Sequence, residues 1–385
     1  MDLDIQKRPI KVLMFVDRLF HGGIQTFIWN NICVLHADKV HIELLILDDG
    51  KHYTMEDDLL AKGIAIHKLN GIWIKTITDY FSYFKAANDF FVKNKDWDIV
   101  HIHASSKALP IAMAAHKYTD AVIIAHSHNT GFQTASRAKQ IIGNAMKIIY
   151  KHYCDFFMGC SYEAGEWLFG KNLVKSHKFM VMPNGINFVK YKYDPILRNG
   201  IRQKYGLNDK LVLGNIARLT SQKNQEFLLK IFYEIKKIND SAILLLVGDG
   251  PDFKYLKSIV EKLKMEKSVI FAGYQTNTAA YFAAMDIFVF PSRYEGFGIS
   301  LLEAQANGLR CFTSTGVTIK SNISGYVKYI SLDKTPAYWA EKIMSVPFKR
   351  FDTNAISNSE YNINNAAEKL LEIYNGLLQS NGDSR

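Results

Sequence analysis

Two glutamates and two glycines in one short stretch are the first residues that suggest chemistry. Glu295, Gly296, Gly298 and Glu303 follow an apolar run. The glycines favour a tight turn, and the residues from Ile299 onward are typical of a helix. Free N–H groups at the start of such a helix suit a diphosphate, and both carboxylates can accept hydrogen bonds from hydroxyl groups of the same ligand. Taken singly, either glutamate could instead be a solvated loop residue or a helix cap.

Two cations five residues apart provide a second candidate contact with phosphate. Arg218 and Lys223 lie in the loop expected after the apolar run 211–217. Two positive side chains that converge on one point stabilise the charge that develops on a diphosphate leaving group. Taken alone, the pair is explained equally well as surface cations after a strand.

A pair of glycines follows the first apolar run of the chain. Adjacent glycines such as Gly22 and Gly23 allow a ligand to approach the backbone closely, although a plain turn between a strand and a helix is the alternative. The stretch lacks the G-x-G-x-x-G pattern, so it does not favour a dinucleotide.

Four histidines form two pairs with two-residue spacing: His101, His103, His126 and His128. Each pair flanks the end of an expected strand. Such spacing can bind a metal, but no matching carboxylate cluster or set of cysteines accompanies it, so a metal is disfavoured. The Asp-x-Asp spacing at residues 96–98 is seen in metal-dependent transferases of another fold. Here it directly precedes a strand and is better explained as a turn leading into it.

The elements that must position these residues form two α/β domains. Short apolar runs separated by amphipathic stretches predict buried parallel strands alternating with helices. A Pro-Asn-Gly turn at 183–185 and a polar stretch after it predict a boundary near residue 187. We expect an N-terminal domain over 8–187, a C-terminal domain over 188–350 and a C-terminal helix over 355–380 that packs back on the first domain. The expected strands are 10–16, 40–47, 64–69, 99–104, 121–125, 156–160, 179–182, 211–217, 242–247, 269–272, 287–290 and 311–313.

Together these motifs resemble glycosyltransferase family four, retaining enzymes of the GT-B fold that include bacterial capsule and exopolysaccharide enzymes. Residues 290–304 resemble the family's E-x7-E block, and residues 214–224 its G-R-L-x-x-x-K-G diphosphate clamp. Ala217 and Asn224 stand where the clamp has glycine, and Arg310 replaces a usual proline. The resemblance covers nearly the whole chain. It implies an α/β fold of two Rossmann-like domains whose parallel sheets face each other across a cleft.

The resemblance also implies roles in binding a nucleotide-sugar donor. Glu295 would contact the donor sugar and Glu303 the ribose, while Arg218 and Lys223 clamp the diphosphate. His128 would touch the sugar; it is favoured over the other histidine of its pair because it lies beyond the expected strand. The other expected donor-binding residues lie in the glycine loop, near the nucleobase pocket and at the helix start: Gly22, Gly23, Tyr274, Phe297, Gly298, Ile299 and Ser300.

Composition limits the class of protein and its partners. The 385 residues include 47 lysines and arginines against 37 acids, and the formal net charge of +10 favours an anionic partner. No run approaches the roughly 18 apolar residues of a membrane helix, and no apolar signal sequence is present, so we expect a cytoplasmic protein. The four cysteines are widely spaced and predict neither disulfides nor zinc. No basic-aromatic cluster supports a nucleic-acid partner.

One basic stretch is a candidate for contact with an anionic membrane surface. Residues 131–154 hold four cations and no acid, with Ile141, Ala145, Ile148 and Ile149 at helical spacing. This pattern is typical of an amphipathic helix at a membrane surface. A helix with its apolar side in the core and its basic side in solvent fits the pattern equally well.

We therefore predict a retaining, metal-independent glycosyltransferase. It would move a sugar from a nucleoside-diphosphate donor, with a UDP-sugar favoured, to a hydroxyl of a glycan or lipid-linked glycan. The nucleotide-sugar is a substrate, and no cofactor is expected. Two alternatives remain: a sugar-nucleotide epimerase of the same fold, which needs no acceptor, and a non-catalytic subunit that binds nucleotide-sugar.

Overall fold

The computed structural model describes residues 8–19, 22–35, 37–69, 77–104, 107–131 and 136–382. The chain divides into two compact units. Unit 1 comprises Met1–Gly185 and Ile363–Arg385, and unit 2 comprises Ile186–Asn362. Within the described ranges, no helix combines the length and apolar character needed to cross a membrane.

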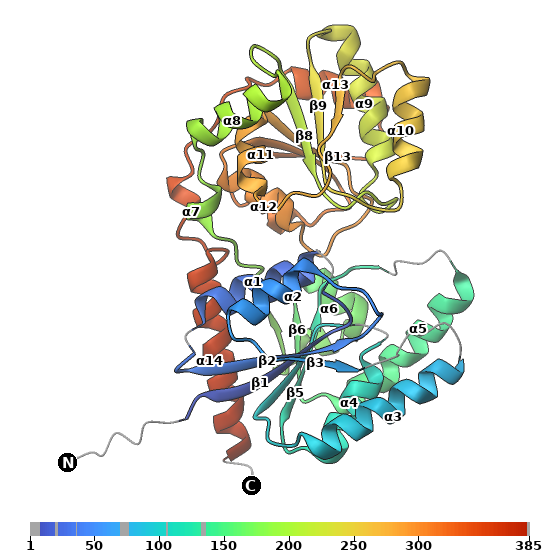
Figure 1. Cartoon of the computed structure of the whole chain (residues 1–385), viewed down its shortest axis with the longest axis vertical. Coiled ribbons are helices and arrows are strands. Elements are labelled where there is room, and N and C mark those ends of the chain that lie inside the picture. Colours follow the sequence, from blue (N-terminus) through green and yellow to red (C-terminus); the bar gives the residue numbers. More distant parts are fainter. Residues whose placement is uncertain are drawn as a thin grey trace, which may run out of the picture. The chain divides into compact units, whose positions relative to one another are not determined.

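Unit 1 is built on a seven-stranded parallel sheet (Figure 1). The strand order is β3-β2-β1-β4-β5-β6-β7. The strands are β1 (Ile10–Val16), β2 (Val40–Leu47), β3 (Ile66–Leu69), β4 (Ile99–Ile102), β5 (Val122–Ser127), β6 (Phe156–Gly159) and β7 (Phe179–Val181). The helices are α1 (Gly23–Val34), α2 (Thr54–Ala61), α3 (Ile77–Lys93), α4 (Leu109–Tyr118), α5 (Arg137–Tyr150), α6 (Tyr162–Phe169) and α14 (Ile363–Gly382), with 3-10 turns at Lys151–Tyr153 and Leu173–Lys175.

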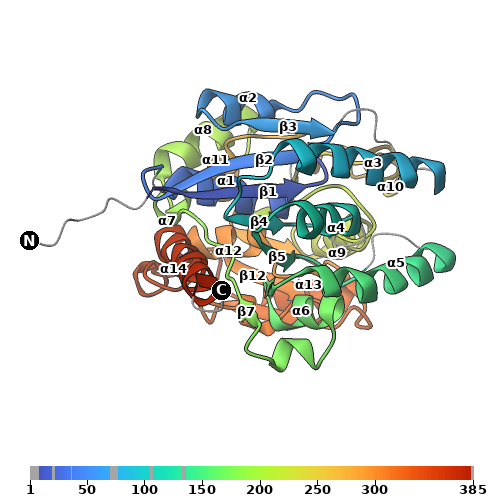
Figure 2. The same ribbon diagram turned by 90° about the horizontal axis from the view of Figure 1, so that it is seen from below.

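Helices cover both faces of this sheet (Figure 2), and strand β1 shows how. Leu13 and Phe15 are buried in a cluster with residues of α3, α4 and α6. Val12 and Met14 are buried in a second cluster with residues of α1, α2 and α14. Successive side chains of a strand point to opposite faces, so a strand that is covered on both sides consists of continuous apolar sequence.

The C-terminal helix α14 belongs to unit 1, although it follows unit 2 in the sequence. Ala366, Leu370 and Tyr374 are fully buried in the same cluster as Phe27 of α1. Gly185 also approaches α14: a Cβ at this position would lie 2.8 Å from the Cβ of Ala366. Only glycine therefore fits where the chain leaves unit 1.

Unit 2 is built on a six-stranded parallel sheet in the order β10-β9-β8-β11-β12-β13. The strands are β8 (Val212–Ile216), β9 (Ile243–Val247), β10 (Val269–Phe271), β11 (Ile287–Phe290), β12 (Arg310–Ser314) and β13 (Val327–Ile330). The helices are α7 (Phe188–Tyr191), α8 (Pro195–Tyr205), α9 (Gln225–Ile238), α10 (Phe253–Lys262), α11 (Thr278–Ala284), α12 (Ile299–Ala306) and α13 (Pro336–Met344), with 3-10 turns at Ile319–Ser321 and Asn354–Ile356.

Both faces of the second sheet are covered as well. Residues of α9, α10 and α13 form a buried cluster with one face of the sheet, in which Trp339 is fully buried. On the strand β11, Phe288 contacts Phe282 of α11, with ring centroids 5.5 Å apart. The α/β class and the two Rossmann-like units expected from the sequence are confirmed.

Candidate active site

The loop between β11 and α12 forms the tight turn that its glycines predict. Gly298 has a φ of +85° and directly precedes the helix, a left-handed conformation that favours glycine. The amides of Leu301 and Leu302 donate to the Gly298 carbonyl. The amides of Ile299 and Ser300 thus come before the first hydrogen-bonded turn and, with the helix dipole, suit a phosphate group.

Glu295, in the same loop, forms an ion pair with Lys223. Nζ of Lys223 lies 2.6 Å from Oε1 of Glu295, and the two side chains are 20% and 8% exposed. The Lys223 ammonium also lies 5.2 Å from the ring centroid of Phe290. A short, charge-assisted hydrogen bond in these surroundings fixes both side chains. The residues expected to contact the sugar and the diphosphate are therefore direct neighbours.

Glu303 lies in the second turn of α12 and is 7% exposed. Burial raises the pKa of its carboxyl to about 7, although a hydrogen bond with the Tyr191 hydroxyl and the charge of Lys190 act in the opposite direction. Tyr191 itself ends α7, and its hydroxyl lies 3.2 Å from that of Thr278. A carboxyl with this pKa exchanges its proton near neutral pH, so hydrogen bonds from ligand hydroxyls would favour its ionised form.

The remaining expected residues of unit 2 differ in exposure. Arg218 is exposed in the loop after β8, and Tyr274 is 43% exposed in the loop after β10. Phe297 is 3% exposed, and its ring stacks on Tyr361 with centroids 5.0 Å apart. The backbone of Phe297, rather than its ring, is therefore the part left for a ligand. These loops follow the carboxyl ends of parallel strands, the edge at which open α/β sheets bind ligands.

In unit 1, the two expected glycines lie between β1 and α1. Gly22 precedes the helix with φ −167° and ψ 175°, an extended conformation open to any residue, and Gly23 is the first helical residue. The backbone conformation at position 22 therefore does not require glycine. The preceding loop residues Phe20 and His21 lie outside the described ranges.

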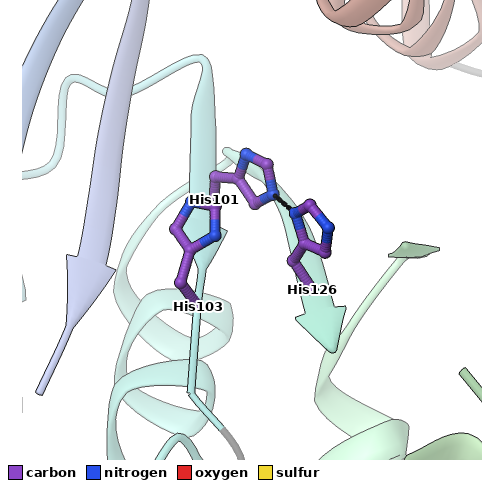
Figure 3. Close-up of side chains that lie close together, drawn as sticks. All are labelled: His101, His103 and His126. Carbon is purple, nitrogen blue, oxygen red and sulfur yellow. Dashed lines mark hydrogen bonds between the residues drawn. The ribbon is translucent and has the colours of Figure 1, made fainter. Parts of the chain in front are cut away.

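The four histidines lie together at the ends of the adjacent strands β4 and β5. Nε2 of His101 lies 3.1 Å from Nδ1 of His126 (Figure 3). Nδ1 of His103 lies 3.0 Å from Nε2 of His128, one residue beyond the end of β5. The rings of His126 and His128 stack with centroids 4.0 Å apart. The two sequence pairs thus form one cluster, which we call the histidine cluster.

The histidine cluster is uncharged near neutral pH. His101, His103 and His126 are at most 1% exposed, and His128 is half-buried. Burial lowers the pKa of His101 and of His128 to about 3, and lowers the pKa of His103 and of His126 well below the ordinary value. Each ring therefore carries one N–H donor and one bare nitrogen acceptor.

Three of these histidines are also close enough to be considered as metal ligands. His101, His103 and His126 each place one ring nitrogen within 4.8 Å of the others. However, His101 hydrogen-bonds with His126, and His103 with His128. These two bonds join the four rings in pairs, while Nε2 of His103 and Nε2 of His126 take part in no hydrogen bond with the described residues.

The Asp-x-Asp spacing has a structural explanation. Asp98 accepts a hydrogen bond of 2.8 Å from the backbone N–H of Lys11 and pairs with Arg8 at 2.7 Å. Asp96 pairs with the side chain of Lys11. Both aspartates precede β4 at the amino ends of the strands, opposite the edge at which α/β sheets bind ligands.

Two tyrosines contact the candidate residues, and the sequence does not predict either contact. Tyr191 hydrogen-bonds with Glu303, and the Tyr374 hydroxyl lies 2.7 Å from Nδ1 of His101. Tyr374 shares a helix face with Leu370, and this pattern indicates a core residue. Its polar contact joins positions 273 residues apart, so no local signal could have revealed it.

Comparisons with known proteins agree with this architecture. The family model described as "Glycosyltransferase Family 4" matches residues 21–189, and that described as "Glycosyl transferases group 1" matches residues 198–353. A Bacillus subtilis protein named as the glycosyltransferase EpsF is 27% identical, with 96% of this chain and 97% of EpsF covered. An Escherichia coli UDP-Gal:alpha-D-GlcNAc-diphosphoundecaprenol alpha-1,3-galactosyltransferase is 26% identical, with 92% and 93% covered.

Solved structures show the same fold. The crystal structure of Anabaena HepE in complex with UDP and glucose superposes with a TM-score of 0.73 at 16% identity, covering 98% of this chain and all of HepE. The two family models together cover both units, and the relatives match them along nearly their whole length. The chain therefore belongs to the family 4 glycosyltransferases and is a glycosyltransferase of the GT-B fold.

Proposed function

We propose that the enzyme transfers a sugar from a nucleoside-diphosphate donor, preferably a UDP-sugar, with retention of the anomeric configuration. The observation that carries this proposal is the buried pair of Lys223 and Glu295 beside the start of α12, with Glu303 one turn into that helix. A lysine, free amides and two carboxylates on adjoining backbone match the parts of a nucleotide-sugar: diphosphate, sugar hydroxyls and ribose hydroxyls.

Catalysis in this proposal is mainly electrostatic. Arg218, Lys223 and the amides of Ile299 and Ser300 stabilise the negative charge that develops on the departing diphosphate. A diphosphate oxygen takes the proton of the acceptor hydroxyl, so no side chain is required as general base. Because protein groups carry the charge stabilisation, we propose that transfer requires no metal ion.

The preference for uridine has support from two relatives. HepE was crystallised with UDP and with UDP-glucose, and the Escherichia coli enzyme is named for a UDP-galactose donor. The latter name also specifies an acceptor attached to diphosphoundecaprenol. We propose a hydroxyl of a glycan or lipid-linked glycan as acceptor here.

A panel of UDP-, GDP- and ADP-sugars, each tested with and without acceptor glycans, tests the donor and the reaction together. Transfer from a UDP-sugar is expected, and proton NMR of the early product should show the donor's anomeric configuration. An inverted anomer refutes retention. Conversion of the donor to an epimer without any acceptor supports the epimerase alternative. Tight UDP binding without any turnover across the panel supports the non-catalytic alternative.

We further propose that α5 holds the enzyme against an anionic membrane that carries the acceptor. The alternative in which the apolar side of this helix lies in the core is wrong, because its isoleucines face solvent. Their exposed fractions are 69% for Ile141, 60% for Ile142, 60% for Ile148 and 46% for Ile149.

The opposite face of α5 is anchored to unit 1. Lys147 is 7% exposed, and its Nζ lies 3.5 Å from the ring centroid of Trp167 and donates to the Trp167 carbonyl at 3.1 Å. Burial lowers the pKa of Lys147 to about 8. Tyr150 is 1% exposed on the same face. The pattern is therefore the opposite of that in an ordinary surface helix: a lysine is buried and the isoleucines face solvent.

A membrane is a better occupant of this surface than a second copy of the chain. Four isoleucines on one helix are far fewer than the roughly 20–30 residues that each partner contributes to a stable protein interface. The absence of acids from 131 to 154, with Arg137 exposed, complements anionic headgroups. A narrow apolar stripe with basic flanks suits shallow insertion into a lipid surface.

Flotation with vesicles tests this surface without any substrate. The full chain is expected to bind vesicles containing phosphatidylglycerol and not vesicles of phosphatidylcholine alone. The double variant Ile141→Ser/Ile148→Ser should bind roughly tenfold more weakly. A matched control, Ile196→Ser/Ile319→Ser, changes isoleucines that are 79% and 75% exposed in unit 2 and should bind as wild type. Equal binding by both variants, or a wild-type dimer that only the α5 variant dissociates, overturns the membrane assignment.

A further inference from the structure

The hydrogen bond between His103 and His128 controls which nitrogen of His128 carries the proton. Nδ1 of His103 lies 3.0 Å from Nε2 of His128, and burial, which lowers the pKa of both rings, favours their neutral form. One ring must therefore donate and the other must accept. The direction of this bond decides whether His128 presents a donor or an acceptor from its other nitrogen.

Nδ1 of His128 is the ring nitrogen that the histidine cluster offers to a ligand. Five of the eight ring nitrogens take part in hydrogen bonds. Nε2 of His103 and Nε2 of His126 are buried without a partner. Of the eight ring nitrogens, the remaining one is Nδ1 of His128, which forms no hydrogen bond with the described residues and is not buried. His128 lines a small hollow together with His103, His126, Ser127 and Asn129.

The unpartnered Nε2 of His103 indicates the direction of the bond. If His128 donated from Nε2, His103 would have to carry its own proton on Nε2, as a buried N–H without an acceptor. Orphaned N–H groups of this kind are rare in folded proteins. If His103 donates from Nδ1 instead, its Nε2 is a bare nitrogen beside the ring of Phe27, whose centroid lies 5.4 Å from that of His103. The second arrangement avoids a buried, unsatisfied donor.

We propose that His103 is a positioning residue that holds His128 in its Nδ1–H tautomer, so that His128 presents a hydrogen-bond donor to an oxygen of the sugar substrate. This inference rests on the proposed function, because it assigns His128 to sugar binding. It adds a residue that does not touch the substrate but acts through the ring that does. A neutral imidazole donor suits a hydroxyl or ring oxygen and would not repel the nearby histidines.

Long-range proton–nitrogen NMR on the full chain labelled with ¹⁵N-histidine reads the tautomer directly. His128 is assigned by comparison with His128→Gln and is expected to show the Nδ1–H form. His103→Leu, which cannot donate, should lose that preference, whereas His103→Asn can place an N–H near the former Nδ1 and should retain it. Tyr374→Phe is the matched control: it removes the hydroxyl bonded to His101 and leaves the His103–His128 bond in place.

Kinetics provide the second measurement. His103→Leu should lower kcat by about tenfold or more with little change in the donor KM. His103→Asn should recover most of that loss, and Tyr374→Phe should stay near wild type. An Nε2–H tautomer of His128 in the wild type overturns the proposal, even if His103→Leu fails to fold. An equal loss of kcat in His103→Leu and Tyr374→Phe also overturns it. Absence of transfer by the wild type would instead count against the proposed function, because the tautomer is read without turnover.

Discussion

The Lys223 ammonium and the Glu295 carboxylate are 2.6 Å apart and largely buried, so each depends on the other. Lys223→Met should lower the free energy of unfolding by about 2–4 kcal/mol, because it leaves Glu295 without its cation. Lys230→Met, which breaks the more exposed pair with Glu226, should cost about 0.5 kcal/mol or less. Denaturant unfolding measures both. Equal losses in the two variants would show that the Lys223 pair behaves as an ordinary surface contact.

The two glutamates should separate in their effects on nucleotide binding. Glu303→Gln should weaken UDP binding by about 1.5–3 kcal/mol, because it removes a charge-assisted hydrogen bond to the ribose. Glu295→Gln keeps an amide oxygen that can accept the hydrogen bond from Lys223, so UDP binding should be nearly unchanged. The same variant should lower kcat, because a misplaced sugar fails in the transition state. Calorimetry with UDP and steady-state kinetics measure these effects. If Glu295→Gln weakens UDP binding as much as Glu303→Gln does, both carboxylates serve the nucleotide.

The raised pKa of Glu303 makes the stability of the protein depend on pH. Since burial raises this pKa from 4.5 to about 7, the stability linked to Glu303 is fully present below pH 4.5 and is lost as the pH rises through about 7. Between pH 5 and pH 8, the free energy of unfolding of Glu303→Gln should therefore rise by about 1–3 kcal/mol relative to that of the wild type. Thermal unfolding across this range measures the difference. The exposed Glu266→Gln is the control, and a similar rise in that variant would point to a general charge effect.

Chelation should not abolish transfer. Because the charge of the leaving diphosphate is assigned to Arg218, Lys223 and backbone amides, activity in EDTA should stay within about twofold of the untreated enzyme. Recovery of a lost activity by manganese or magnesium would refute this assignment. That result would also favour the histidine cluster as a metal site.

Strands buried on both faces could be predicted closely from the sequence. The apolar runs 10–16 and 40–47 coincide with β1 and β2, and all twelve expected strands are present. The sequence does not predict strand β13, because β13 is the edge strand of its sheet and has Lys328 exposed in the middle of a four-residue strand. A short strand that is covered incompletely lacks the continuous apolar signal.

The candidate site could be predicted in its residue types but not in its contacts. The glycine turn at Gly298 and the helix after it follow from local sequence. The pairing of Lys223 with Glu295 and the bond between Tyr374 and His101 depend on how distant segments pack. The same limit applies to α5, whose isoleucine periodicity predicts an amphipathic helix but not which side faces the core.

The return of α14 to unit 1 has a consequence for biosynthesis. The cluster around Val12, Met14 and Phe27 contains Ala366, Leu370 and Tyr374, and the ribosome makes these three only after all of unit 2. The amino-terminal sheet therefore emerges with one apolar face incomplete, while unit 2 has its whole sequence before α14 is made. A nascent chain that stops before residue 363 leaves the apolar surface that α14 covers exposed to solvent. Chaperones and proteases are expected to recognise this surface.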